Sequence, residues 1–183
     1  MIDVSRKEVR DNVLAQMMAI LDDVPVDYIK WDYNRNMTEI GTAAPGALPG
    51  EVLHKYMLGL YEVMEALVTK YPQILFESCS GGGGRFDPGI LYYMPQTWTS
   101  DNTDAVARLE IQYGTSLVMP ISSMGSHVSA NPNHQTHRKA SMKMRGDVAM
   151  AGNLGYELDV TTISEAEKQE MKEEISFYKE NTK

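Results

Sequence analysis

Residues 26–36 read VDYIKWDYNRN, a mostly apolar stretch that ends in a run of charged and amide side chains. Its valine, tyrosine and isoleucine are typical of a strand that enters a buried core. Because side chains alternate along a strand, Lys30 and Asp32 are predicted to lie on the same side of it. An ammonium group beside a carboxylate favours the ionised carboxylate. The stretch therefore predicts a strand over 26–32 that carries candidate reactive groups at its end.

Patterns of helix and strand alternate along the rest of the chain. Apolar residues recur at helical spacing over 5–22, 50–70, 104–117 and 137–151. Short apolar runs predict further strands at 74–78, 97–100, 119–124 and 155–158. Such alternation favours an α/β fold with a parallel sheet and helical crossovers. We expect a single domain over 1–183 with about five parallel strands.

Three local patterns add detail to this scheme. Ser5 with Glu8, and Ser164 with Glu167, have the spacing of a capping box at the start of a helix. Within 104–117 the residues at helical spacing are Ala105, Leu109, Gln112, Tyr113 and Ser116. The segment 80–89, SGGGGRFDPG, is expected to have no regular structure.

Composition excludes several classes of function. The 183 residues are 43% hydrophobic and 23% charged, as in an ordinary globular protein. A net charge of -8 without a basic stripe argues against nucleic acid and against an anionic membrane surface. The single cysteine, Cys79, allows no internal disulfide, and no apolar run approaches the roughly 20 residues of a membrane span. We expect a cytoplasmic protein.

Polar side chains gather where the predicted strands end. They occupy 30–32, 77–79, 98–101, 122–127 and 153–157. In parallel α/β barrels the active site is built at this rim from several strands. The order of the chain thus predicts one site assembled from several strand ends.

Two carboxylates of this set stand close to tryptophans. Asp32 follows Trp31 directly, and Asp101 comes three residues after Trp98. Tryptophan faces stack on sugars, and a pair of carboxylates can serve as nucleophile and acid/base at a glycosidic bond. The pattern favours carbohydrate chemistry.

The same residues can also be explained by purely structural roles. Lys30 and Asp32 are also what a partly exposed salt bridge at a strand end requires. Asp101 or Thr103 can cap the following helix, with Asp104 in its first turn. One of these groups is expected to cap the helix. At least one of the two carboxylates is then free for another role, and the spacing does not decide which. Asn34 and Arg35 have the chemistry to bind sugar hydroxyls.

The glycine run and the histidines do not form other known sites. The glycines at 81–84 lack the Gly-Lys-Ser/Thr that a phosphate loop requires, so we expect them to let the backbone approach a ligand. Cys79 has no histidine beside it in sequence, which disfavours a nucleophilic role. The histidines at 54, 127, 134 and 137 lack the spacing of a metal site. We therefore expect neither metal nor cofactor.

Four segments carry a family resemblance: KWDYNR (30–35), ESCSGGGGRFDPG (77–89), QTWTSDNTDA (96–105) and MGSHVSANPNHQ (124–135). They resemble the catalytic domain of bacterial α-galactosidases of glycoside hydrolase family 36, over essentially the whole chain. The resemblance implies a (β/α)8 barrel that hydrolyses terminal α-galactosides of the melibiose and raffinose type by retaining double displacement.

The resemblance also implies roles for individual residues. Asp32 matches the nucleophile of the family motif, and Asp101 matches the acid/base. Residues that match substrate-binding positions are Lys30, Asn34, Cys79, Gly82 and Trp98.

A complete barrel has eight strands in about 250 residues, so the five expected here are assigned to its fourth to eighth strands. The family's N-terminal β-sandwich, first barrel strands and C-terminal β-domain then lie outside this sequence. Unpaired strand edges predict a homo-oligomer or association through those edges, and an isolated chain that is inactive for want of a complete barrel. Two alternatives stay open: a catalytically silent fragment that binds galactose or assembles with a partner, and an α-galactosyl transferase relative.

Overall fold

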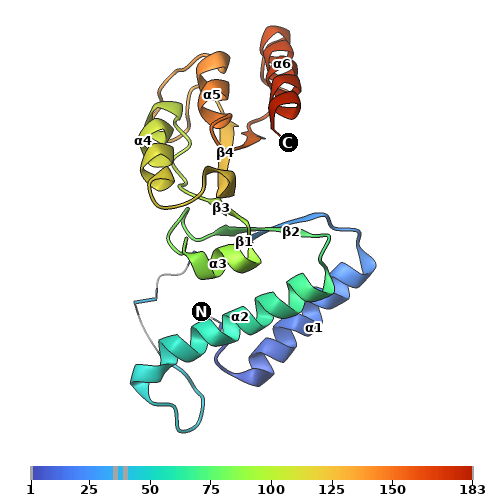
Figure 1. The fold of residues 1–183 in the computed structure, drawn as a ribbon, viewed down its shortest axis with the longest axis vertical. Helices are drawn as coiled ribbons and strands as arrows, with labels where there is room; N and C mark the ends of the chain where they lie inside the picture. The colour runs from blue at the N-terminus through green and yellow to red at the C-terminus, as the bar shows by residue number, and fades with distance from the viewer. Residues whose placement is uncertain (1, 35–36, 39–40, 183) are drawn as a thin grey trace. The chain divides into compact units, whose positions relative to one another are not determined.

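Helices and strands alternate along the chain in the computed structural model, which describes residues 2–34, 37–38 and 41–182 (Figure 1). The elements are α1 (Lys7–Asp23), β1 (Tyr28–Asp32), the 3-10 turn η1 (Pro49–Glu51), α2 (Val52–Lys70), β2 (Leu75–Cys79), α3 (Pro88–Tyr93), β3 (Gln96–Trp98), α4 (Ala105–Ser116), the 3-10 turn η2 (Ile121–Ser123), β4 (Met124–Ser129), α5 (Met142–Ala149), β5 (Asn153–Glu157) and α6 (Glu165–Asn181). In this part of the chain the five strands form one sheet in the order β1-β2-β3-β4-β5. The predicted parallel α/β fold is confirmed.

The chain divides into two compact units. The first comprises residues 1–77 and 87–95, and the second comprises 78–86 and 96–183. The strand β2 thus begins in the first unit and ends in the second. That the chain is a single domain stays a prediction.

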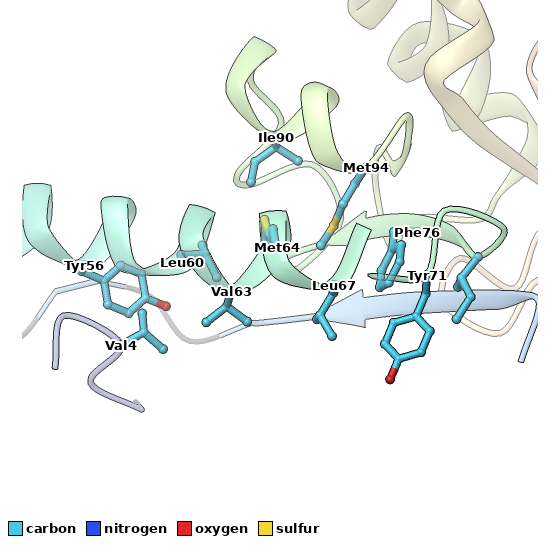
Figure 2. Packing of buried hydrophobic residues seen from close by; sticks show 11 residues of the cluster. Val4, Tyr56, Leu60, Val63, Met64, Leu67, Tyr71, Phe76, Ile90 and Met94 are labelled. Atoms are coloured by element: carbon cyan, nitrogen blue, oxygen red, sulfur yellow. The ribbon is translucent and has the colours of Figure 1, made fainter. Parts of the chain in front are cut away.

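The hydrophobic core of the first unit packs against α2. Buried residues at helical spacing on this helix, Leu60, Met64 and Leu67, meet Phe76 of β2 and Ile90 of α3 (Figure 2). The helix α1 lies beside α2 and contributes partly buried apolar side chains to the same cluster. Burying each large aliphatic side chain contributes about 1.5–3 kcal/mol, so this packing fixes β1 and β2 in the unit.

The second unit is organised around β4. This strand pairs in parallel with β3, where Trp98 faces Gly125, and with β5, where His127 faces Gly155. The helix α5 covers β4, and α6 packs beside α5. The buried cluster between them consists of Val128, Met142, Ala149 and Met171.

The structure corrects three sequence predictions about where elements lie. The strand predicted at 119–124 is wrong: Pro120 precedes the turn η2, and β4 runs from Met124 to Ser129. The helix α5 begins at Met142 rather than at 137, since His137 has a φ of 57°, which no α-helix accommodates. The segment 80–89 is not wholly irregular, because Asp87 accepts hydrogen bonds from the amides of Gly89 and Ile90 and so starts α3.

The spacing over 104–117 predicts the helix α4 but not which of its residues are buried. Its buried residues are Ala105, Arg108 and Gln112, whereas Leu109 and Tyr113 are 50% and 69% exposed. The helix therefore turns a cation and an amide toward the sheet. The buried Arg108 and Gln112 side chains bear on the candidate site described below.

One of the two predicted capping boxes is present. Ser164 accepts a hydrogen bond from the amide of Glu167, whose carboxylate accepts one from the Ser164 amide. The box predicted at Ser5 is wrong, because α1 begins at Lys7. There the Ser5 hydroxyl donates to Asp3 at 2.5 Å, and Glu8 accepts from Arg6.

Replacing Ser164 by alanine is expected to loosen the first turn of α6. Loss of an N-cap costs about 1 kcal/mol, which corresponds to roughly fivefold faster local opening. Hydrogen exchange of the amides at 165–168 measures this. The same substitution at Ser176, exposed within α6, is the control, because alanine is a better helix former there. Equal exchange in the two variants would contradict the capping role.

Candidate active site

The end of β1 presents an alternating pattern of exposure. Tyr28, Lys30 and Asp32 are exposed, while Ile29 and Trp31 pack against the core of the first unit. The alternation confirms that Lys30 and Asp32 share one face of the strand. It follows that Trp31 points to the opposite face, so this ring is part of the core packing.

Hydrogen bonds and an ion pair hold the polar face of β1. The Asn34 amide nitrogen donates to Asp32 Oδ2 at 3.0 Å. The Lys30 ammonium lies 3.5 Å from Glu77 Oε1, and the Tyr28 hydroxyl donates to Glu77 Oε2. Glu77 is fully buried in β2, so its carboxyl group is a fixed partner that holds Lys30 in place. Arg35 lies outside the described residues.

Sequence reasoning did not single out Glu77. It was grouped with the polar residues at the end of its strand, without a role of its own. The available signal was a carboxylate inside the apolar run ILFESC, which is expensive to bury unless a partner is present. Its partners come from β1, the neighbouring strand, and local sequence does not show which strands are neighbours.

The glycine run packs against the segment that carries Asp101. A Cβ on Gly82 would lie 2.6 Å from Ser100 Cα and 3.0 Å from the Asp101 amide nitrogen, and Gly82 has a φ of 78°. The Gly83 amide donates to the Thr99 carbonyl at 3.0 Å. At these two glycines the backbone closely approaches the chain itself, and the expected approach of a ligand, with the substrate-binding role of Gly82, stays a prediction. The glycines therefore support the backbone on which Asp101 is placed.

The structure separates the two aspartates of SDNTDA. Asp101 is exposed in a bend after β3. Asp104 is buried at the N-cap position of α4, and its carboxylate lies 3.5 Å from the Arg138 guanidinium. Because α4 begins at Ala105, Asp101 stands too early in the chain to cap it. In the described part of the chain no side chain makes a cap hydrogen bond to α4, so the expectation that one of these groups caps the helix is wrong. Exposure separates Asp101 from the buried Asp104, a point that spacing alone did not decide.

Cys79 and Trp98 are both 3% exposed. The Trp98 ring lies 4.4 Å from the His127 ring, centroid to centroid, and the Arg108 guanidinium carbon lies 4.7 Å from its centroid. The His127 ring in turn lies over Gly155, and its Nδ1 is 3.5 Å from Glu157. Trp98 is therefore enclosed by a cation and an imidazole that sequence reasoning did not assign to the site. The substrate-contact roles of Cys79 and Trp98 stay predictions.

The predicted site residues fall in both units. Lys30, Asp32 and Asn34 belong to the first unit. The others, Cys79, Gly82, Trp98 and Asp101, belong to the second. Among the described residues, no group of three or more histidine, cysteine, aspartate or glutamate side chains is arranged to hold a metal ion. Over the same ranges, the helices are too short or too polar to span a membrane.

Gly82→Ala is expected to cost more than Gly81→Ala. Both glycines have positive φ, which costs an alanine roughly 1–2 kcal/mol, but a Cβ at Gly81 meets no atom within 4 Å. At Gly82 the Cβ must push away the backbone of Ser100 and Asp101. Misplacement of a reactive group by about 1 Å costs about 100-fold in rate, so we expect that loss of kcat/KM in the complete protein for Gly82→Ala alone. Thermal unfolding of both variants checks the shared strain, and equal kcat/KM values would contradict the assignment.

In the described residues, five parallel strands that alternate with helices define a class of protein. It is the α/β class to which the (β/α)8 barrel belongs. The chain provides part of such a barrel.

Comparison with known proteins gives the family. The Melibiase family model matches residues 1–183, and the chain belongs to this family. It is 62% identical to the α-galactosidase AgaA of Geobacillus stearothermophilus over 180 residues, 98% of this chain and 25% of the relative. It is 54% identical to the α-galactosidase Mel36A of Lactobacillus acidophilus over 179 residues, 97% of this chain and 24% of the relative.

Solved structures agree. A variant of the Geobacillus AgaA in complex with raffinose matches with a TM-score of 0.93 and 62% identity, over 97% of this chain and 25% of that one. A second variant, in complex with stachyose, matches with the same TM-score, identity and coverage. The chain thus spans about a quarter of the length of the relatives that it matches.

Proposed function

We propose that the protein is a retaining α-galactosidase that hydrolyses terminal α-galactosyl residues of oligosaccharides such as melibiose and raffinose. Membership of the Melibiase family supports the reaction class, and relatives solved with raffinose and stachyose support the class of substrate. The observation that carries the mechanism is the pair of exposed carboxylates, Asp32 and Asp101, each held by its own unit at the C-terminal side of a strand. The activity is proposed for the complete protein.

In the first step of the proposed reaction, an Asp32 oxygen attacks the anomeric carbon. The bond from that carbon to the leaving oxygen breaks, and Asp101 gives its proton to that oxygen. In the second step, Asp101 takes a proton from water, and the water oxygen displaces Asp32 from the anomeric carbon. Two inversions give galactose with the α configuration of the substrate. Retaining enzymes place the two carboxyl groups about 5–5.5 Å apart, which the proposal requires of the complete protein.

The neighbours of Asp32 suit the role of nucleophile. The hydrogen bond from Asn34 fixes Oδ2, which leaves Oδ1 for attack. The ion pair with Glu77 holds the Lys30 ammonium on the strand face that it shares with Asp32, where it can meet sugar hydroxyls. Asp101 is exposed in a polar bend, where its carboxyl group is accessible to a leaving group and to water. Association of copies through strand edges stays a prediction.

The stereochemistry of the first product tests this proposal. The complete protein is mixed with an aryl α-galactoside, and proton NMR follows the anomeric signal before mutarotation. We expect α-galactose to appear first. Initial formation of β-galactose would show an inverting mechanism, and an absence of hydrolysis would contradict the reaction class.

A further inference from the structure

Arg108 is a buried cation on the inner side of α4. It is 2% exposed, and its guanidinium makes three hydrogen bonds: Nη1 to the Ser100 carbonyl at 3.1 Å, Nη2 to the Gly125 carbonyl at 2.7 Å and Nε to Gln112 Oε1 at 3.0 Å. It also lies over the Trp98 ring. Oxygen atoms of neutral groups and an aromatic face thus surround the positive charge.

These partners tie three segments of the second unit together. Ser100 directly precedes Asp101, Gly125 is the second residue of β4, and Trp98 ends β3. On another side, Gly82 touches the Ser100 and Asp101 backbone. The bend that carries Asp101 is therefore held between the glycine run and a guanidinium anchored to the next strand. A group that delivers a proton must be placed within hydrogen-bond reach of its acceptor, so this anchoring bears on the chemistry.

Burial alone does not remove the charge. Desolvation lowers the pKa of Arg108 to about 10, and the Glu157 carboxylate acts in the opposite direction, so the side chain stays protonated at neutral pH. Hydrogen bonds from a charged donor are stronger than hydrogen bonds between neutral groups. The Ser100 carbonyl is held by a stronger bond than an amide or a hydroxyl would give.

We propose that Arg108 is a positioning residue for Asp101 in the proposed reaction, acting through the Ser100 carbonyl. The inference rests on the proposed function. It predicts a selective defect: loss of Arg108 impairs protonation of the leaving group more than it impairs attack by Asp32. A role in stability alone predicts instead an equal loss for all substrates, in proportion to the protein that unfolds.

The test compares substrates that need acid catalysis to different extents. In the complete protein, kcat/KM is measured for raffinose, whose leaving group is a hydroxyl oxygen of a sugar and needs a proton, and for 2,4-dinitrophenyl α-galactoside, whose leaving group departs without a proton. The variants are Arg108→Met, Arg108→Lys, Asp101→Ala and Arg145→Met. Arg145 is a matched control, since it is also buried, donates to the Ser129 carbonyl and pairs with Glu167.

We expect Arg108→Met to lose about 10- to 100-fold more kcat/KM on raffinose than on the activated substrate, which is less than the roughly 10²–10⁴-fold lost with the general acid itself because Asp101 is misplaced but still present. Arg108→Lys should lose less, because it keeps a cation that can reach one carbonyl. Arg145→Met should affect both substrates equally.

The remaining outcomes decide against the inference or against its premise. Equal losses on both substrates for both Arg108 variants, with a selective loss for Asp101→Ala, would overturn the inference and leave the proposed function intact. An equal loss for Asp101→Ala would overturn the acid/base assignment and the inference with it. If Arg108→Met does not fold, Arg108→Lys gives the decision, with rates expressed per active site by titration.

Discussion

Replacing Asp32 by alanine in the complete protein should lower kcat for an aryl α-galactoside by about 10⁴-fold or more. The alanine removes the group that forms the covalent intermediate, and loss of a nucleophile in other enzymes has costs of this order. KM should change much less, because the substrate contacts proposed for Lys30 and Asn34 remain. Steady-state kinetics with a 4-nitrophenyl leaving group measures both constants.

The control for this variant is Asp27→Ala. Asp27 is an exposed aspartate just before β1, and its backbone carbonyl accepts a hydrogen bond from the Leu75 amide. We expect its activity to stay within about twofold of the unchanged protein, as for other exposed substitutions. Added azide should restore turnover to Asp32→Ala and give the inverted β-galactosyl azide. Full activity of Asp32→Ala would contradict the proposal that Asp32 is the nucleophile.

Asp101→Ala should produce a different defect. Because the acid/base group acts on the leaving oxygen and later on water, we expect a loss of about 10²–10⁴-fold in kcat/KM on raffinose and a small loss on an activated aryl galactoside. Azide should increase kcat on the activated substrate and give the α-galactosyl azide, since it replaces the second step only. The anomeric configuration of the azide thus separates Asp101 from Asp32.

Asp104→Asn is the matched control for Asp101. The Asp104 carboxylate is buried and pairs with Arg138, so its loss should reduce stability rather than alter the dependence on the leaving group. A dependence on the leaving group in Asp104→Asn that is absent from Asp101→Ala would reverse the two assignments.

The order of helices and strands could be predicted from the sequence because periodicity and caps are local. The box at Ser164 and Glu167 is complete within four residues, and it is present as predicted. The position of β4 could not be predicted, because its polar serines are buried by distant partners: Ser126 donates to Gln112, and Ser129 donates to the Thr103 carbonyl. Read alone, a run of serines, glycine and histidine is typical of a loop.

The same limit applies to the candidate site. That Lys30 and Asp32 share a face follows from the period of a strand, and the structure confirms it. The difference between Asp101 and Asp104 depends on where α4 begins and on Arg138, 34 positions further along the chain. The burial of Arg108 could not be predicted, because an arginine on a helix is expected at the surface. The available signal was its spacing: Arg108 comes three residues after Ala105 and four before Gln112, so the three residues share one face of the helix.

The most direct test of the central claim is to trap the covalent intermediate. The complete protein is incubated with 5-fluoro-α-galactosyl fluoride, whose fluorine at C5 slows breakdown of the glycosyl-enzyme, and is then digested and analysed by mass spectrometry. We predict one added fluorogalactosyl group on the peptide that contains Asp32, and no such addition in Asp32→Ala. A label on any other carboxylate, with Asp32 unmodified, would contradict the mechanism proposed here.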